Sequence, residues 1–161
     1  MTFVDPAGAL TVSAALATWL RGRVLELRQT GRRQRFAARL ELVSTVPGSV
    51  EVLACRSSVE EIDDHALRVD LLSRLLMSVD LEQAGHAPGV VLRRFPGPAV
   101  ALVHVRPGLP EPSDSDIAWL AAARCQAGMT AVAVSCAFAL TRWGWVELAG
   151  GERRTWVRLR P

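Results

Sequence analysis

The sequence predicts a single α+β domain over residues 1–161, with three helices and a largely antiparallel sheet of about six to seven strands. Half of the residues are hydrophobic, which is enough for a packed core in a chain of one-domain length. Segments with helical periodicity alternate with pairs of short apolar segments that meet at glycine-containing turns. The expected order is helix, hairpin, helix, hairpin, helix and three strands, which favours helices on one face of the sheet.

The first helix is expected over residues 11–30, where apolar residues recur at helical spacing before a glycine. Residues 35–43 then alternate between apolar and charged side chains, as is typical of a half-buried strand whose charged face, including Glu41, meets solvent. The Pro-Gly turn at 47–48 leads to a hairpin partner that begins at residue 50 and ends at 55.

The second helix is predicted to begin at a capping box, in which Ser58 and Glu61 satisfy each other's free amide groups. Two apolar stripes follow at helical spacing, and a surface helix of a monomer needs only one. The first stripe, expected to face the core, comprises Ile62, Ala66, Val69, Leu72, Leu76 and Val79. The second stripe, on roughly the opposite side, comprises Leu67, Leu71 and Leu75.

Two further hairpins and a third helix complete the predicted fold. Residues 90–95 and 99–105 read as one hairpin, and the second of these strands is apolar on both faces, which indicates a central position in the sheet. Ser113 and Asp116 are expected to cap a helix over 114–127. A strand over 131–140 and a last hairpin, 143–149 with 155–160 around a Gly-Gly turn, are expected to follow.

Composition and the first residues predict where in the cell the protein is found. No apolar run approaches the length that crosses a bilayer, and residues 1–6 do not resemble a signal peptide, so we expect a cytoplasmic protein. Cys55, Cys125 and Cys136 form no CxxC pair and are expected to be buried free thiols. All 19 basic residues are arginine, which is also what a GC-rich bacterial genome encodes, so arginine richness by itself indicates no nucleic-acid partner.

The sequence contains no motif for a cofactor or a metal, so we predict neither, and we do not expect an enzyme. Phosphate-binding loops, HExxH and GxSxG are absent, and the histidines lack cysteines at metal-ligand spacing. The acidic run 60–64 offers several carboxylates, but helix capping and the helix dipole explain them fully. An enzyme would need a site assembled only in three dimensions, for example from Glu51, His104 and an arginine.

The function predicted first is a non-catalytic protein–protein interaction module that associates with itself, of the chaperone, adaptor or assembly-subunit type. The stripe Leu67, Leu71 and Leu75 is the expected partner-binding surface, unless it is buried within the fold. Charge is segregated along the chain, with an acidic middle between basic ends, and this pattern also suits self-association.

The alternative function is nucleic-acid binding, because clustered arginines attract phosphates and neighbouring tryptophans can stack on bases. A structural role for the same residues, with tryptophans in the core and arginines in solvent, is the competing interpretation. The residues that would carry this function are Arg21, Arg28, Arg32, Arg33, Arg35, Trp143, Trp145, Arg154, Trp156 and Arg158.

Two stretches resemble known families in the order of their elements. Residues 50–125, a strand, a helix with a Leu-Leu pair, a hairpin and Leu-Pro before a helix, resemble small secretion-chaperone-type domains, which implies a dimeric peptide-binding module. Residues 99–149, a strand and a helix followed by Gly-Met-Thr-Ala-Val-Ala-Val and a phenylalanine, are similar to the end of restriction-endonuclease-like domains, which implies nucleic acid as a ligand. In that family's terms Glu51 would take an acidic position, but His104 and Arg106 replace the later acidic and lysine pair, so the resemblance implies a degenerate metal site.

Overall fold

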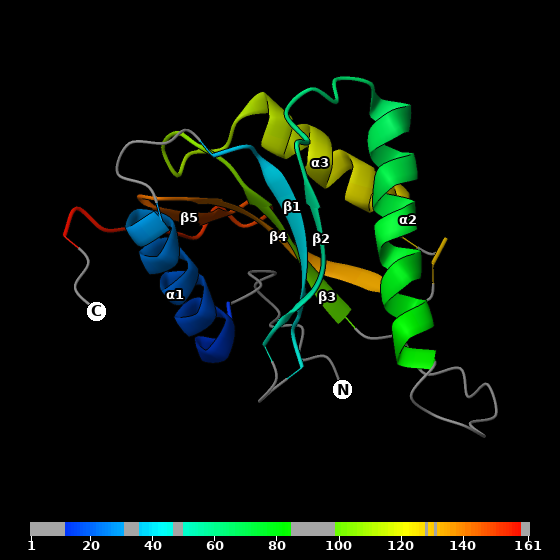
Figure 1. Ribbon diagram of the computed structural model, residues 1–161, viewed down its shortest axis with the longest axis horizontal. Coiled ribbons are helices and arrows are strands. Elements are labelled where there is room, and N and C mark those ends of the chain that lie inside the picture. Colours follow the sequence, from blue (N-terminus) through cyan, green and yellow to red (C-terminus); the bar gives the residue numbers. More distant parts are fainter. Residues whose placement is uncertain are drawn as a thin grey trace.

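The structure is a computed structural model that describes residues 12–30, 36–46, 50–84, 99–127, 129–130 and 132–158. Within these residues it contains the three predicted helices and six strands (Figure 1). The helices are α1 (Ala14–Thr30), α2 (His65–Ala84) and α3 (Asp114–Cys125). The strands are β1 (Arg39–Ser44), β2 (Val52–Ser57), β3 (Ala99–Val105), β4 (Ala133–Thr141), β5 (Gly144–Glu147) and β6 (Arg153–Thr155).

The six strands form one open sheet in the order β2-β1-β3-β4-β5-β6. Neighbouring strands run antiparallel except β3 and β4, which are parallel and are joined through α3. The predicted α+β class and the largely antiparallel sheet are therefore confirmed. None of the described helices combines the length and the apolar composition that crossing a bilayer requires.

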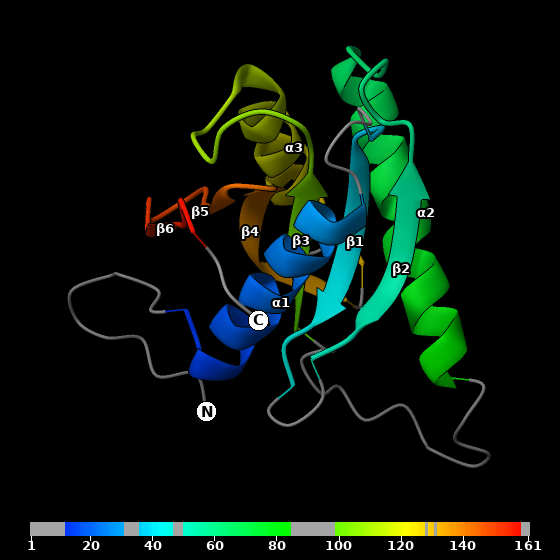
Figure 2. The ribbon, with the colours of Figure 1, turned by 60° about the vertical axis from the view of Figure 1, so that its left-hand side comes forward.

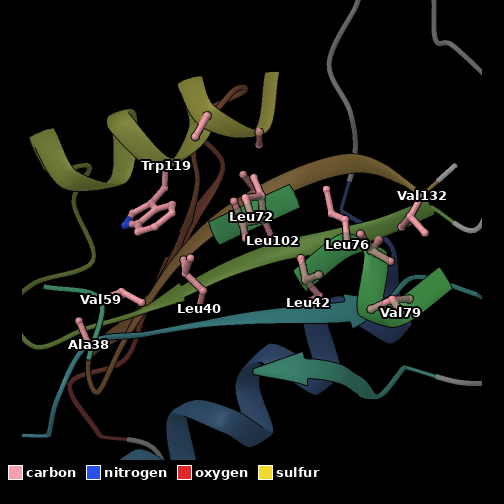
Figure 3. Packing of buried hydrophobic residues seen from close by; sticks show 14 residues of the cluster. Ala38, Leu40, Leu42, Val59, Leu72, Leu76, Val79, Leu102, Trp119 and Val132 are labelled. Carbon is pink, nitrogen blue, oxygen red and sulfur yellow. The ribbon is translucent and has the colours of Figure 1, made fainter. Parts of the chain in front are cut away.

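The sheet is covered by helices on both faces, so the expectation of helices on one face is wrong (Figure 2). Apolar residues of α2 and α3 pack on one face around Trp119, Leu72 and Leu76, as Figure 3 shows. On the other face, α1 packs its apolar stripe against β1, β3, β4 and β5. The charged and apolar residues that alternate along β1 therefore both become buried, and the strand is not half-buried as predicted.

β3 is the central strand that its sequence predicts. It pairs with β1 along one edge from Val100 to Val105 and with β4 along the other from Ala99 to Val105. The predicted hairpin partner, residues 90–95, lies outside the described residues.

The capping box predicted at Ser58 is wrong, because the chain extends past it before α2 begins. Ser58 has a positive φ of 59°, and the next residue, Val59, is buried and donates its N–H to the Ala38 carbonyl at 3.2 Å. The helix begins after Asp64, whose side chain accepts the N–H of Leu67 at 2.9 Å. Asp64 therefore caps α2 in the manner that the sequence predicts for Ser58.

The third helix and the last turn are confirmed in detail. Ser113 and Asp116 form a capping box at the start of α3. The Gly-Gly turn between β5 and β6 places Gly151 at φ +76°, which favours glycine. The final strand spans only 153–155, so the predicted strand over 155–160 is wrong at 156–158, and its last two residues lie outside the described residues. Gly144 lets the two strands approach, because a Cβ there would lie 2.0 Å from the Arg154 carbonyl oxygen.

Candidate interaction surface

An edge strand and a helix form the candidate interaction surface. β2 lies at one end of the sheet, and among the described residues it pairs with β1 alone. Backbone groups of β2 that point away from β1 therefore have no strand partner in the described part of the chain. Val52 is 40% exposed, and Cys55, Arg56 and Ser57 are exposed as well. Figure 2 shows this edge running beside α2.

The second apolar stripe of α2 reaches solvent next to this edge. Leu67 is 59% exposed, whereas Leu71 and Leu75 are half-buried and pack against the core that α2 shares with α3. Asp70 and Arg74 lie on the same outward side and form an exposed ion pair at 3.0 Å. We call β2 together with Leu67, Leu71, Asp70 and Arg74 the α2–β2 surface.

The first apolar stripe of α2 is buried only in its later part. Its later members, Leu72, Leu76 and Val79, are buried as predicted, but Ala66 is exposed and Ile62 only partly buried. The polar side chain that fills the core in this first turn is Arg68, whose guanidinium lies 5.6 Å from the centre of the Trp119 ring. A buried arginine in this position was not predicted, because its spacing alone places it between the two stripes.

The tryptophans of the predicted nucleic-acid surface lie in three different environments. Trp143 is 44% exposed, Trp156 is half-buried against the core beneath α1, and Trp145 is fully buried. Trp145 stacks edge-on against Phe138, with ring centres 5.7 Å apart. The inclusion of Trp145 in a base-stacking surface is therefore wrong, because no base can reach its ring.

The arginines of that surface are distributed in the same uneven way. Arg21, Arg154 and Arg158 are exposed, whereas Arg32, Arg33 and Arg35 lie outside the described residues. Arg28 covers the Trp143 ring at 5.3 Å from its centre and donates to the carbonyl oxygens of Arg142 and Trp156. Arg28 therefore joins the end of α1 to the last two strands.

The most complete buried polar network surrounds the carboxylate of Asp116, which is fully buried. His104 Nδ1 lies 2.7 Å from Oδ1, Arg106 Nη2 donates to Oδ2 at 2.6 Å, and Ser113 donates its N–H and hydroxyl to Oδ2, each at 2.8 Å. These hydrogen bonds outweigh the effect of burial and hold the pKa of Asp116 well below its usual range. The network joins the end of β3 to the start of α3.

This network does not form the site that His104, Glu51 and an arginine would build. His104 is 2% exposed and lies opposite Leu40 in the sheet, whereas Glu51 is exposed and lies beside Ser44, at the other end of β1. The two side chains are therefore separated by most of the length of a strand. Arg106 and Asp116 hold the loop 106–113 and the capping box in place, so their role is structural.

A second buried carboxylate, Glu41, was predicted to face solvent. It is 1% exposed, because α1 covers its face of β1. Its Oε1 accepts from Arg39 Nε at 2.8 Å and from Arg23, which also pairs with Glu26. The two arginines neutralise the carboxylate. Alternation within β1 gave no signal of this burial, since the covering helix comes from a different part of the chain.

The cysteines and the acidic run carry no metal site in the described part of the chain. Cys55 and Cys125 are exposed free thiols and Cys136 is partly buried, so the prediction of burial is wrong for the first two. Burial raises the pKa of Cys136. No group of three or more metal-ligating side chains occurs among the described residues.

Two half-open hollows flank the first half of β4, with volumes of about 150 and 180 Å³. Their walls are mostly apolar, and Ser135 and Cys136 line both. Among the described residues of their lining, Glu147 is the one carboxylate, and it accepts the backbone N–H groups of Ala149, at 3.0 Å, and Gly150. Its oxygens are thereby used to hold the β5–β6 turn.

Comparisons with known proteins place the chain in no family: no family model, no curated protein and no solved structure matches it.

Proposed function

We propose that the chain is a non-catalytic protein–protein interaction module of the adaptor, chaperone or assembly-subunit type, which associates with itself through the α2–β2 surface. The observation that carries this proposal is that β2 ends the sheet among the described residues and lies beside a leucine stripe in which Leu67 is exposed and Leu71 is half-buried. A strand edge offers backbone hydrogen bonds to a partner, and exposed leucine adds apolar area to bury. Among the described residues, in contrast, the buried carboxylates of Asp116 and Glu147 hold a helix cap and a turn, and that of Glu41 is paired with two arginines.

Replacing Leu67 with aspartate is expected to weaken self-association. Burying a leucine side chain stabilises an interface by about 1.5–3 kcal/mol, so its loss should raise the dimer Kd by at least about tenfold. Because Leu67 is 59% exposed in the single chain, the fold should tolerate the change better than at half-buried Leu71. Sedimentation equilibrium over a range of protein concentrations measures the Kd.

Leu109 supplies a matched control, since it is 61% exposed and lies in the loop before α3, away from the α2–β2 surface. Leu109→Asp should leave the dimer Kd unchanged, and both variants should keep the thermal unfolding profile of the monomeric fold. A wild-type chain that stays monomeric at the highest attainable concentration contradicts the proposal.

A second candidate function, nucleic-acid binding, is favoured by Trp143, an exposed ring beside Arg28 that can stack on a base. This candidate predicts that the chain binds a single-stranded oligonucleotide with a log–log salt dependence of several units. Trp143→Ala should then weaken binding by about 1–3 kcal/mol, measured by fluorescence anisotropy. Arg124→Ala, an exposed arginine in the last turn of α3, is the control that should change little. Undetectable binding at low salt rules this function out.

A further inference from the structure

We infer that the partner at the α2–β2 surface is a second copy of this chain, joined edge to edge along β2 so that the two sheets become one. This inference rests on the proposed self-association and adds its geometry. The two copies would be related by a two-fold axis perpendicular to the sheet, because only such an axis pairs a strand antiparallel with itself and keeps like faces together.

The two ends of the sheet differ in how they are protected from such pairing. β6 has three residues, two of which are arginines, and short charged edge strands resist addition of another strand. β2 has six residues, contains no proline and carries a single charge, Arg56. Of the two edges that the described strands leave, β2 is therefore the one that suits the addition of a second copy.

The two-fold axis places a specific residue at the centre of the interface. Under this symmetry the central residue of β2 pairs with its own copy, and the middle of Val52–Ser57 is Ala54 or Cys55. Directly opposite residues have Cβ atoms about 4.5–5.5 Å apart, and diagonal neighbours about 7–8 Å. The two Cys55 side chains therefore come within about 8 Å of each other in either register.

The faces of β2 determine what lies beside the axis. Ala54 is opposite Leu42, which faces α2 and α3, whereas Cys55 is opposite Glu41, which faces α1. The α2 helices of both copies thus share one face of the joined sheet and run antiparallel on either side of the axis. The thiols lie on the other face and remain accessible to a reagent.

Charge on α2 is complementary to an antiparallel copy of itself. The outward side of α2 presents Asp70 and Arg74 beside Leu67. An antiparallel copy of α2 presents the same two charges in reverse order, so that the two helices can place opposite charges beside the leucines that they bury. This self-complementarity selects a second copy over a partner of single-signed charge.

The position of Cys55 gives a direct test by cross-linking with a short bis-maleimide. The wild-type chain should form a covalent dimer at concentrations where it is a dimer by mass. The Cys125→Ser variant should form the same product, because Cys125 is exposed but lies on α3. The Cys55→Ser variant should lose it. Burial and Glu41 raise the pKa of the Cys55 thiol, so the reaction is run at about pH 8.

A charge exchange tests the antiparallel helices without using a thiol. Asp70→Arg should raise the dimer Kd by about twofold to fivefold, and the double variant D70R/R74D should restore it. A dimer by mass that gives no cross-link, or whose cross-link persists in Cys55→Ser, overturns this geometry and leaves the proposed self-association standing. A chain that remains monomeric overturns both.

Discussion

Replacing Asp116 with alanine is expected to lower the free energy of unfolding by about 3–5 kcal/mol, the usual cost of removing one partner from a buried ion pair. The carboxylate is fully buried and is contacted by His104, Arg106 and Ser113. Without it, the guanidinium of Arg106, with a side chain only 12% exposed, loses its carboxylate partner, and α3 loses its capping box. Urea unfolding followed by circular dichroism measures the change.

Asp114 is the matched control, because it lies in the same first turn of α3 but is exposed. Asp114→Ala should cost less than about 1 kcal/mol, the contribution of a charge near a helix N-terminus. A loss at Asp116 no greater than the loss at Asp114 would contradict the stabilising role given to the network.

The same carboxylate gives the wild-type chain a defined acid sensitivity. The pKa of Asp116 is lower in the folded chain than the value of about 3.9 for an unfolded aspartate. Its stabilising effect is therefore fully present above about pH 4 and is lost as the pH falls further. The difference in stability between wild type and Asp116→Ala should shrink as the pH falls below about 4.

The parts of the fold that the sequence predicted are those that local chemistry determines. Ser113 and Asp116 cap α3 because the two residues satisfy each other within one turn, and Gly151 takes the positive φ of its turn without help from distant segments. The central position of β3 could likewise be predicted from the sequence, since a strand that is apolar on both faces must be covered on both.

The errors arose where distant segments decide the structure. Glu41 is buried because α1 lies over β1, and α2 begins late because Val59 is held against the sheet at Ala38. The parallel pairing of β3 with β4 follows from the passage of the chain through α3. None of these contacts changes the pattern of apolar and polar residues within the segment concerned, so that pattern could not predict them.

The candidate interaction surface was predictable in one half only. The leucine stripe of α2 follows from helical spacing, and Leu67 is indeed exposed, although Leu71 and Leu75 serve the core in part. The open edge of β2 depends on strand order, which local sequence does not encode. Residues 50–55 were predicted as half of a hairpin, and only the assembled sheet shows that they end it.

Replacing Trp145 with alanine is expected to cost about 3–5 kcal/mol of unfolding free energy, since it leaves a large cavity in the core beneath α1. The ring is fully buried and stacks edge-on against Phe138, a contact that would also be lost. The loss should appear as a lower midpoint of urea unfolding with an unchanged slope.

The control for this prediction is Trp143→Ala, which removes a tryptophan two residues away that does not lie in the core. Its ring is 44% exposed and contacts the guanidinium of Arg28, an interaction worth about 0.5–1 kcal/mol at an exposed site. Trp143→Ala should therefore cost about 1 kcal/mol or less. Equal losses in the two variants would mean that Trp145 does not fill the core, whereas a large difference assigns the core position to Trp145 and leaves Trp143, in the turn before β5, as the ring available to a ligand.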